Sequence, residues 1–151
     1  MTLDRIAMRP LIVALAVLFL AGFAAPRASA QVDGAKSLHS GTWTKKTNKI
    51  AGTWSIVEKN GKKSVVLDKA FKTSKAPDLK IILSPAESSK LTNKNAMKKA
   101  VVISLLKSPK GAQSYQIPKG IDLSKFKTIA IHCEKYSKLW GSASLAAPKA
   151  P

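Results

Sequence analysis

The side chains with the clearest chemical potential lie near the C-terminal end of the sequence, where the only cysteine, Cys133, directly follows His132. A thiol beside an imidazole can act as a nucleophile with its base. Residues 126–134, however, have the composition of a strand, in which neighbouring side chains point to opposite faces. Cys133 is in phase with Ile129 and Ile131, so we expect it to point inward, where free cysteine behaves as a small hydrophobe. A reactive pair of Cys133 and His132 is therefore disfavoured.

Other patterns of catalysis or metal binding are missing from the sequence. It has no G-x-S-x-G, no H-E-x-x-H and no phosphate-cradling glycine loop. Two histidines and one cysteine do not complete a zinc site, and there is no C-x-x-C-H motif for covalent haem. We therefore expect no catalytic residues and no metal site. Cys133 is the candidate redox group or cofactor ligand, and His132, His39 and Trp140 are accessory candidates. The cofactor stays open, although a single cysteine thiolate is chemically able to hold haem.

The first thirty residues have the pattern of a secretory signal. Arg5 and Arg9 precede an apolar run over residues 11–25, and Ala28-Ser29-Ala30 has the small-x-small form of a cleavage site. The apolar run is short for a membrane span, which needs about 20 residues. We expect cleavage after Ala30, no membrane span in the remaining chain and a secreted or periplasmic protein.

The chain is strongly basic, with a formal net charge of +18. Residues 1–30 carry three arginines and one aspartate, so cleavage would leave +16. Such a charge disfavours tight self-association and favours anionic partners. We expect a monomer with an acidic or anionic extracytoplasmic partner, and no nucleic acid, because the lysines are spread along the whole chain. A solvated basic surface without a specific partner is the alternative interpretation.

Residues 37–146 form one predicted all-β domain, an antiparallel β-sandwich or flattened barrel of about seven to nine short strands. Residues 31–36 would be a flexible start and residues 147–151 a disordered tail. Asn60-Gly61 predicts a hairpin turn, and Trp54 alternates with Ile56 as core. Residues 100–106, AVVISLL, predict a strand buried on both faces. Residues 85–99 predict a polar loop or loose helical turn.

The order of several short motifs resembles the DM-thirteen domain family, an extracytoplasmic β-sandwich module often found beside DOMON domains. The resemblance covers residues 37–145 and rests on the following residues: Gly41-Thr42-Trp43, Gly52-Thr53-Trp54-Ser55-Ile56, Ala76-Pro77-Asp78-Leu79, Tyr115-Gln116-Ile117-Pro118, and Ile131-His132-Cys133 with Trp140-Gly141.

The resemblance implies a role in electron transfer, with a redox-active or cofactor-binding cysteine that corresponds to Cys133. It also singles out Asp78, in the Pro-Asp-Leu turn, as an accessory polar residue. The chain departs from the family pattern at Asn48 and His132, where histidine and an aromatic residue are common.

Three hypotheses follow for an exported protein of this kind. The first is a small redox or electron-transfer accessory protein that uses Cys133, with Lys127, Lys135 and Lys138 as candidate charges to favour the thiolate. The second is a basic binding module without chemistry, in which Cys133 only fills the core. The third is a partner in an intermolecular disulfide through Cys133. Independent enzymatic activity is not expected from any of the three.

Overall fold

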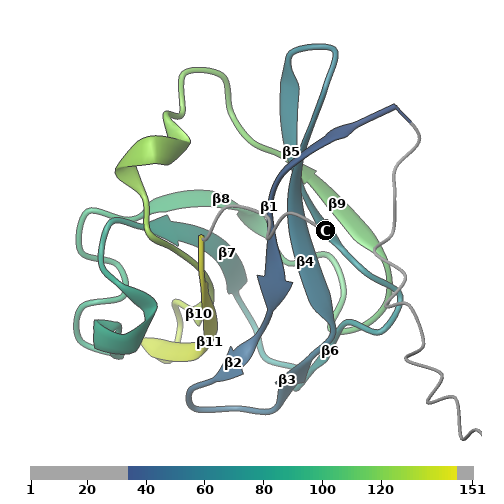
Figure 1. Ribbon diagram of the computed structural model, residues 1–151. Coiled ribbons are helices and arrows are strands. Elements are labelled where there is room, and N and C mark those ends of the chain that lie inside the picture. Colours follow the sequence, from purple (N-terminus) through teal and green to yellow (C-terminus); the bar gives the residue numbers. More distant parts are fainter. Residues whose placement is uncertain (1–33, 146–151) are drawn as a thin grey trace, which may run out of the picture.

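Two antiparallel sheets packed face to face form the body of the protein (Figure 1). The computed structural model describes residues 34–145, so the expected signal segment (1–30) and tail (147–151) lie outside the described residues. The four-stranded sheet has the order β1-β4-β5-β9, comprising Lys36–Thr42, Thr53–Lys59, Lys62–Leu67 and Gln113–Gln116. The five-stranded sheet has the order β2-β11-β10-β7-β8, comprising Thr44–Lys45, Lys138–Ser144, Thr128–Cys133, Leu79–Ser84 and Val101–Leu105.

A small two-stranded sheet closes one end of the sandwich, below the larger sheets in Figure 1. It pairs β3 (Ile50–Ala51) with β6 (Lys72–Thr73). Two short 3-10 helices complete the described elements, η1 (Ser88–Lys90) and η2 (Leu123–Lys125). Neither is long enough to cross a membrane, and the described residues contain no other helix that could. Eleven strands occur within residues 34–145, three of them with two residues each. The predicted all-β sandwich is confirmed.

The core lies between the two large sheets, and it follows the alternation of the sequence. On β7, Leu79, Ile81 and Leu83 all point into it, as do Trp54 and Ile56 on β4. The Asn60-Gly61 turn is also confirmed, because both residues have positive φ, +51° and +69°, and join β4 to β5 as a two-residue hairpin. Alternating apolar residues and a tight turn therefore account for the core between the two large sheets.

The prediction for residues 100–106 was wrong. The strand there, β8, is at the edge of its sheet, and Val102 and Leu105 are 39% and 57% exposed. The strand buried on both faces is β10, in which all six residues are buried. β8 has a neighbouring strand on one side only, and its outer face is exposed to solvent. An apolar run in the sequence therefore did not identify the central strand of the sheet.

The polar segment of residues 85–99 provides the cover for β10. It contains η1 and a series of turns, and it lies against the outer face of the five-stranded sheet. Leu91 and Ala96 from this segment pack with Ile82, Ala130 and Leu139 in a second, smaller core. The cover is also hydrogen-bonded to the sheet, because the Asn93 side chain accepts the backbone N–H of Leu139 at 2.8 Å.

Gly52 is required where β3 meets β4. Its φ is +94°, and a Cβ atom there would lie 2.5 Å from Cα of Phe71. We expect Gly52→Ala to lower the free energy of unfolding by about 2–5 kcal/mol, since it adds left-handed strain to a backbone clash. Urea denaturation would measure this. Gly61 is the matched control: its φ is +69°, but nothing lies within 4 Å of the added atom, so Gly61→Ala should cost about 1–2 kcal/mol. Equal losses would contradict the steric argument.

Candidate functional site

Cys133 is the last residue of β10, and its side chain points into the main core. The side chain is completely buried, in the same cluster as Ile129 and Ile131. Its Sγ donates a hydrogen bond to the backbone carbonyl oxygen of Pro77, at 3.1 Å. A thiol donates such a bond through its S–H group.

The turn that contains Pro77 and Asp78 covers the thiol. Asp78 has φ +62°, a left-handed conformation that aspartate tolerates better than most residues. The Asp78 carbonyl accepts the N–H of Glu134, at 3.2 Å, which ties the turn to the residue after Cys133. On the other side, the Leu79 carbonyl accepts the N–H of Leu106, at 2.7 Å. The turn is therefore fixed to both neighbouring strands, β10 and β8.

A surface pocket of about 600 Å³ lies on the solvent side of this turn. It is lined by residues 75–79 of the turn and by residues 105–109, which follow β8. Pro77 thus lines the pocket while its carbonyl oxygen bonds Cys133 Sγ. Pro77 therefore connects the wall of the pocket to the sulfur.

Charged groups surround the turn. The ammonium group of Lys80 lies 3.5 Å from the Asp78 carboxylate, and it also pairs with the Glu134 carboxylate. The Asp78 and Lys80 side chains are only 34% and 21% exposed, so this linked set is less screened than a surface ion pair. Lys80 and Glu134 were not among the residues predicted from the sequence. Lys80 follows Leu79 on β7 and Glu134 directly follows β10, and their proximity depends on a register that the sequence alone does not specify.

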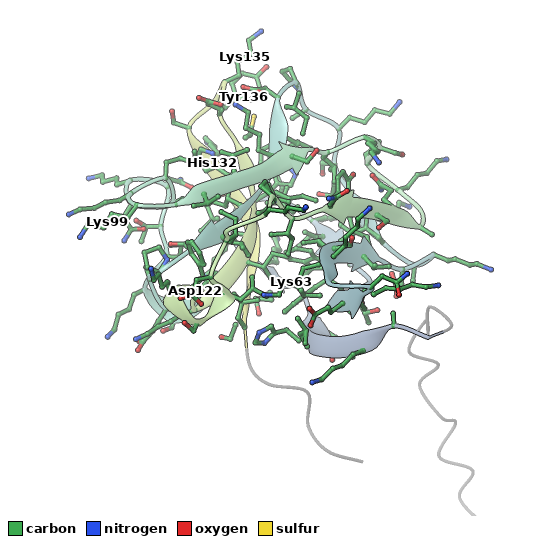
Figure 2. The ribbon with its side chains drawn as sticks, turned by 90° about the horizontal axis from the view of Figure 1, so that it is seen from above. Lys63, Lys99, Asp122, His132, Lys135 and Tyr136 are labelled. Carbon is green, nitrogen blue, oxygen red and sulfur yellow. The ribbon has the colours of Figure 1, made fainter. Side chains whose placement is uncertain are left out.

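His132 lies on the other face of β10 from Cys133. In the pairing of β10 with β7, the partner of His132 is Lys80. It is buried, 2% exposed, and both of its ring nitrogens lack a hydrogen-bond partner within residues 34–145. Burial lowers the pKa of His132 below its usual value of 6.5, and the Lys80 ammonium lowers it further, while Asp78 acts in the opposite direction. The imidazole is therefore neutral at pH 7. Figure 2 shows it beside the outer part of the sheet.

The structure does not bring the other accessory candidates into a single group with Cys133. His39 is half-buried on β1, in the four-stranded sheet, whereas Cys133 belongs to the five-stranded sheet. Trp140 is buried in the same core as Cys133. The backbone N–H of Asn48, the position at which histidine is common in the family, donates to the Trp140 carbonyl at 3.4 Å. Trp140 therefore packs in the core beside the thiol. Neither Trp140 nor His39 forms a reactive pair with Cys133.

The three lysines proposed to favour a thiolate are exposed to solvent. Lys127 lies 3.7 Å from the Glu87 carboxylate. Lys138 is the strand partner of Cys133 on β11, and Lys135 lies in the turn between these strands, where it projects from one end of the molecule (Figure 2). Their charges are in water, where they act weakly on a buried sulfur.

Neither haem nor a metal centre fits this arrangement. An axial cysteine ligand needs its sulfur to face an open cavity. Here Cys133 Sγ faces the Pro77 carbonyl, and the adjoining pocket is lined by Pro77 and not by Cys133. The described residues also contain no group of three or more His, Cys, Asp or Glu side chains that could hold a metal ion. The chemistry of the site therefore depends on the Cys133 thiol and on the Pro77–Asp78 turn that covers it.

The sequence profile of one protein family matches most of this domain. The family is described as Electron transfer DM13, and the match covers residues 42–145. The chain belongs to this family. Its matched region includes Cys133, the Pro77–Asp78 turn and every strand from β2 to β11, so the predicted DM-thirteen resemblance is confirmed. No curated protein and no solved structure matches the chain.

The pKa of His132 predicts a pH-dependent stability. The unfolded chain binds a proton near pH 6.5, but the folded chain does so only at lower pH. Stability should be full above pH 6.5 and fall as the pH drops, by at most about 1.4 kcal/mol per pH unit. His132→Phe should remove this slope and add about 1 kcal/mol at pH 7, because it removes two unpaired buried nitrogens.

Urea denaturation of the wild type and of His132→Phe between pH 5 and 8 would measure both effects. An unchanged slope in His132→Phe would assign the pH dependence to other groups.

Asp78 should control access to Cys133. Valine disfavours the left-handed conformation by about 1–2 kcal/mol, so Asp78→Val should raise the population with an open turn about 5–30-fold. The rate at which the folded protein reacts with iodoacetamide at Cys133 should rise by the same factor. Asp78→Asn loses the charge that pairs with Lys80 but keeps the tolerated backbone, and it should change the rate by less than about threefold. If the valine and asparagine variants react equally fast, the turn is not the barrier.

Proposed function

We propose that this protein is an exported electron-transfer protein and that Cys133 is the group through which it exchanges electrons. The family description, electron transfer, supports the general redox role. The signal pattern of residues 1–30 supports export to the periplasm or the exterior of the cell. The protein would act as an accessory to a redox partner and not as an independent enzyme.

One observation supports the choice of Cys133 most strongly. The thiol is buried, yet it is bonded to the inner side of a turn whose outer side lines a surface pocket. A buried position protects the sulfur from adventitious oxidation, which is a hazard for a free thiol outside the cytoplasm. Across Pro77, an acceptor docked in the pocket would take one electron from the sulfur while the thiol proton passes to water, and a docked donor would return one electron as the sulfur regains a proton. This arrangement suits electron exchange with a docked partner better than attack on a substrate.

The burial of Cys133 counts against the third hypothesis, an intermolecular disulfide. Disulfide exchange requires direct contact between a thiolate and the sulfur that it attacks. Cys133 has 0% exposure, so its sulfur meets another molecule only when the Pro77–Asp78 turn opens.

A non-catalytic basic binding module remains the second candidate function. It is favoured by the distribution of lysine, whose side chains project from all sides of the domain (Figure 2). Lys80, Lys90, Lys125 and Lys127 form ion pairs, but a formal net charge of +18 leaves an excess of positive charge for an anionic partner. In this alternative, the protein is a monomer that docks to an acidic surface, and Cys133 only packs.

Redox titration of the purified protein separates the two functions. We expect the wild-type protein to show a reversible redox wave in protein-film voltammetry, and Cys133→Ala to lose it while keeping its fold by circular dichroism. Lys119→Gln, which changes an exposed lysine, should keep the wave. If the wild-type protein shows no wave and Cys133 resists both oxidants and alkylating reagents while folded, electron transfer through Cys133 is wrong. Intact mass of the protein from its own compartment would report cleavage after Ala30 and the state of the thiol.

A further inference from the structure

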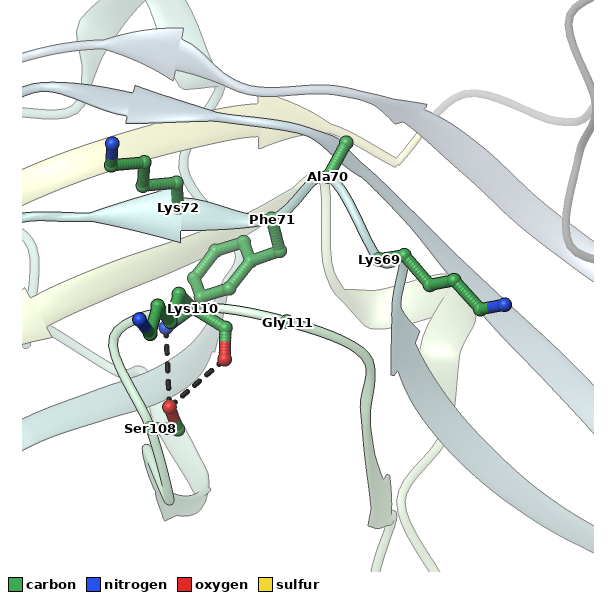
Figure 3. Close-up of a pocket in the computed structure, with 7 residues that line it drawn as sticks. All are labelled: Lys69, Ala70, Phe71, Lys72, Ser108, Lys110 and Gly111. Atoms are coloured by element: carbon green, nitrogen blue, oxygen red, sulfur yellow. Dashed lines mark hydrogen bonds between the residues drawn. The ribbon is translucent and has the colours of Figure 1, made fainter.

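Two lysines face each other across strands near the end of the sandwich that carries β6. Lys72 of β6 and Lys110 form an isolated antiparallel bridge. Residues that are directly opposite in such a pair have Cβ atoms about 4.5–5.5 Å apart on the same face, and like charges at this position destabilise the pairing. Figure 3 shows both lysine side chains at the wall of the pocket, with the Lys72 ammonium above the β6 ribbon and the Lys110 ammonium below it.

No carboxylate offsets this repulsion. In the part of the chain that the structure describes, neither Lys72 nor Lys110 takes part in an ion pair. The acidic residue closest in sequence to Lys72 is Asp68, and it forms none of the ion pairs among the described residues. One of its carboxylate oxygens accepts the hydroxyl of Thr53 at 2.8 Å, and the other is buried near Gly52. The positive charges are left without an internal partner.

The two lysines line a surface pocket of about 470 Å³. Its wall is completed by Lys69, Ala70, Phe71, Ser108 and Gly111 (Figure 3). Backbone hydrogen bonds hold the two sides of the pocket together, from Gly111 N–H to the Phe71 carbonyl at 2.9 Å and from Thr73 N–H to the Pro109 carbonyl at 2.8 Å. The backbone that carries the lysines is therefore fixed before any ligand arrives.

The hydroxyl of Ser108 restrains the same loop. It donates to the Lys110 carbonyl at 2.9 Å and accepts the Lys110 N–H at 3.3 Å. The Ser108 side chain is thus occupied by the backbone, so the ammonium groups are the donors that the pocket offers to a ligand. Three lysines suit an anion that is part of a larger molecule as well as a free ion, because the volume exceeds that of a single oxyanion, while the Phe71 ring is buried in the core.

We propose that this pocket binds a tetrahedral oxyanion, which the ammonium groups of Lys72 and Lys110 hold between them, with Lys69 as a third positive charge at the rim. Phosphate and sulfate groups share this chemistry, and the group is supplied either as the free ion or as the sulfate ester of a polysaccharide. An anion between the two lysines replaces their repulsion by two charge-assisted contacts. The site is separate from Cys133, which does not line this pocket, so it does not depend on electron transfer.

Binding titrations followed by NMR would test the site. The wild-type protein would be titrated with inorganic phosphate, inorganic sulfate and a sulfated oligosaccharide, at constant ionic strength in chloride, with the amide signals of Lys72 and Gly111 as reporters. We expect saturable shifts for all three, and at least about a tenfold loss of affinity in the variant with Lys72→Gln and Lys110→Gln. Without ligand, that variant should melt about 1–4 °C higher than the wild type, because the repulsion is relieved.

Lys119→Gln is the matched control, since it removes an exposed lysine beyond the far end of β9 and should keep wild-type affinity. Cys133→Ala should also bind normally, which separates this site from the redox proposal. A sulfated oligosaccharide that binds at least tenfold more tightly than inorganic sulfate assigns the polymer as the source, and equal affinities assign the free ion. If Lys119→Gln weakens binding as much as the double variant, or if the double variant binds like the wild type, the proposal is wrong.

Discussion

The burial of β10 on both faces is the constraint on which the rest of this structure depends. A strand inside a two-sheet sandwich normally has one face in the core and one in water. In this protein the segment of residues 85–99 covers the outer face as well, and it turns the centre of the five-stranded sheet into a three-layered region. Each fully buried isoleucine there contributes about 1.5–3 kcal/mol. The strand that carries the thiol is therefore packed on both faces.

This double burial also determines what the two neighbouring chemical groups can do. Strand alternation sends Cys133 to the inner core and His132 to the outer one, so neither can reach the other. Each is desolvated in its own layer, the thiol with one backbone acceptor and the imidazole with none among the described residues. The end of the strand is where this protection stops. There, the Pro77–Asp78 turn contacts the sulfur on one side and lines a surface pocket on the other, and Lys80 links the turn to Glu134.

The charged side chains are not distributed in layers as the buried apolar side chains are. Most lysines surround the domain singly and are solvated, as expected for a protein that stays soluble through its net charge. Near the thiol, a lysine is paired with two carboxylates, whereas at the end that carries β6 two lysines oppose each other without a carboxylate. The first arrangement stabilises the cover of the thiol, and the second offers a place for an anion. Net charge alone distinguishes neither location.

The sequence by itself determined the fold class, the Asn60-Gly61 hairpin, the core positions of Trp54 and Ile56 and the inward direction of Cys133, because these depend on local alternation and turn chemistry. Only the tertiary structure decided which strand is central. An apolar run such as residues 100–106 indicates burial but not which neighbours provide it, and the cover of β10 comes from a segment whose own composition is polar. The contacts of Cys133 with Pro77 and of Lys72 with Lys110 join residues 56 and 38 positions apart in the chain. Sheet order and register decide such contacts, and no local pattern encodes them.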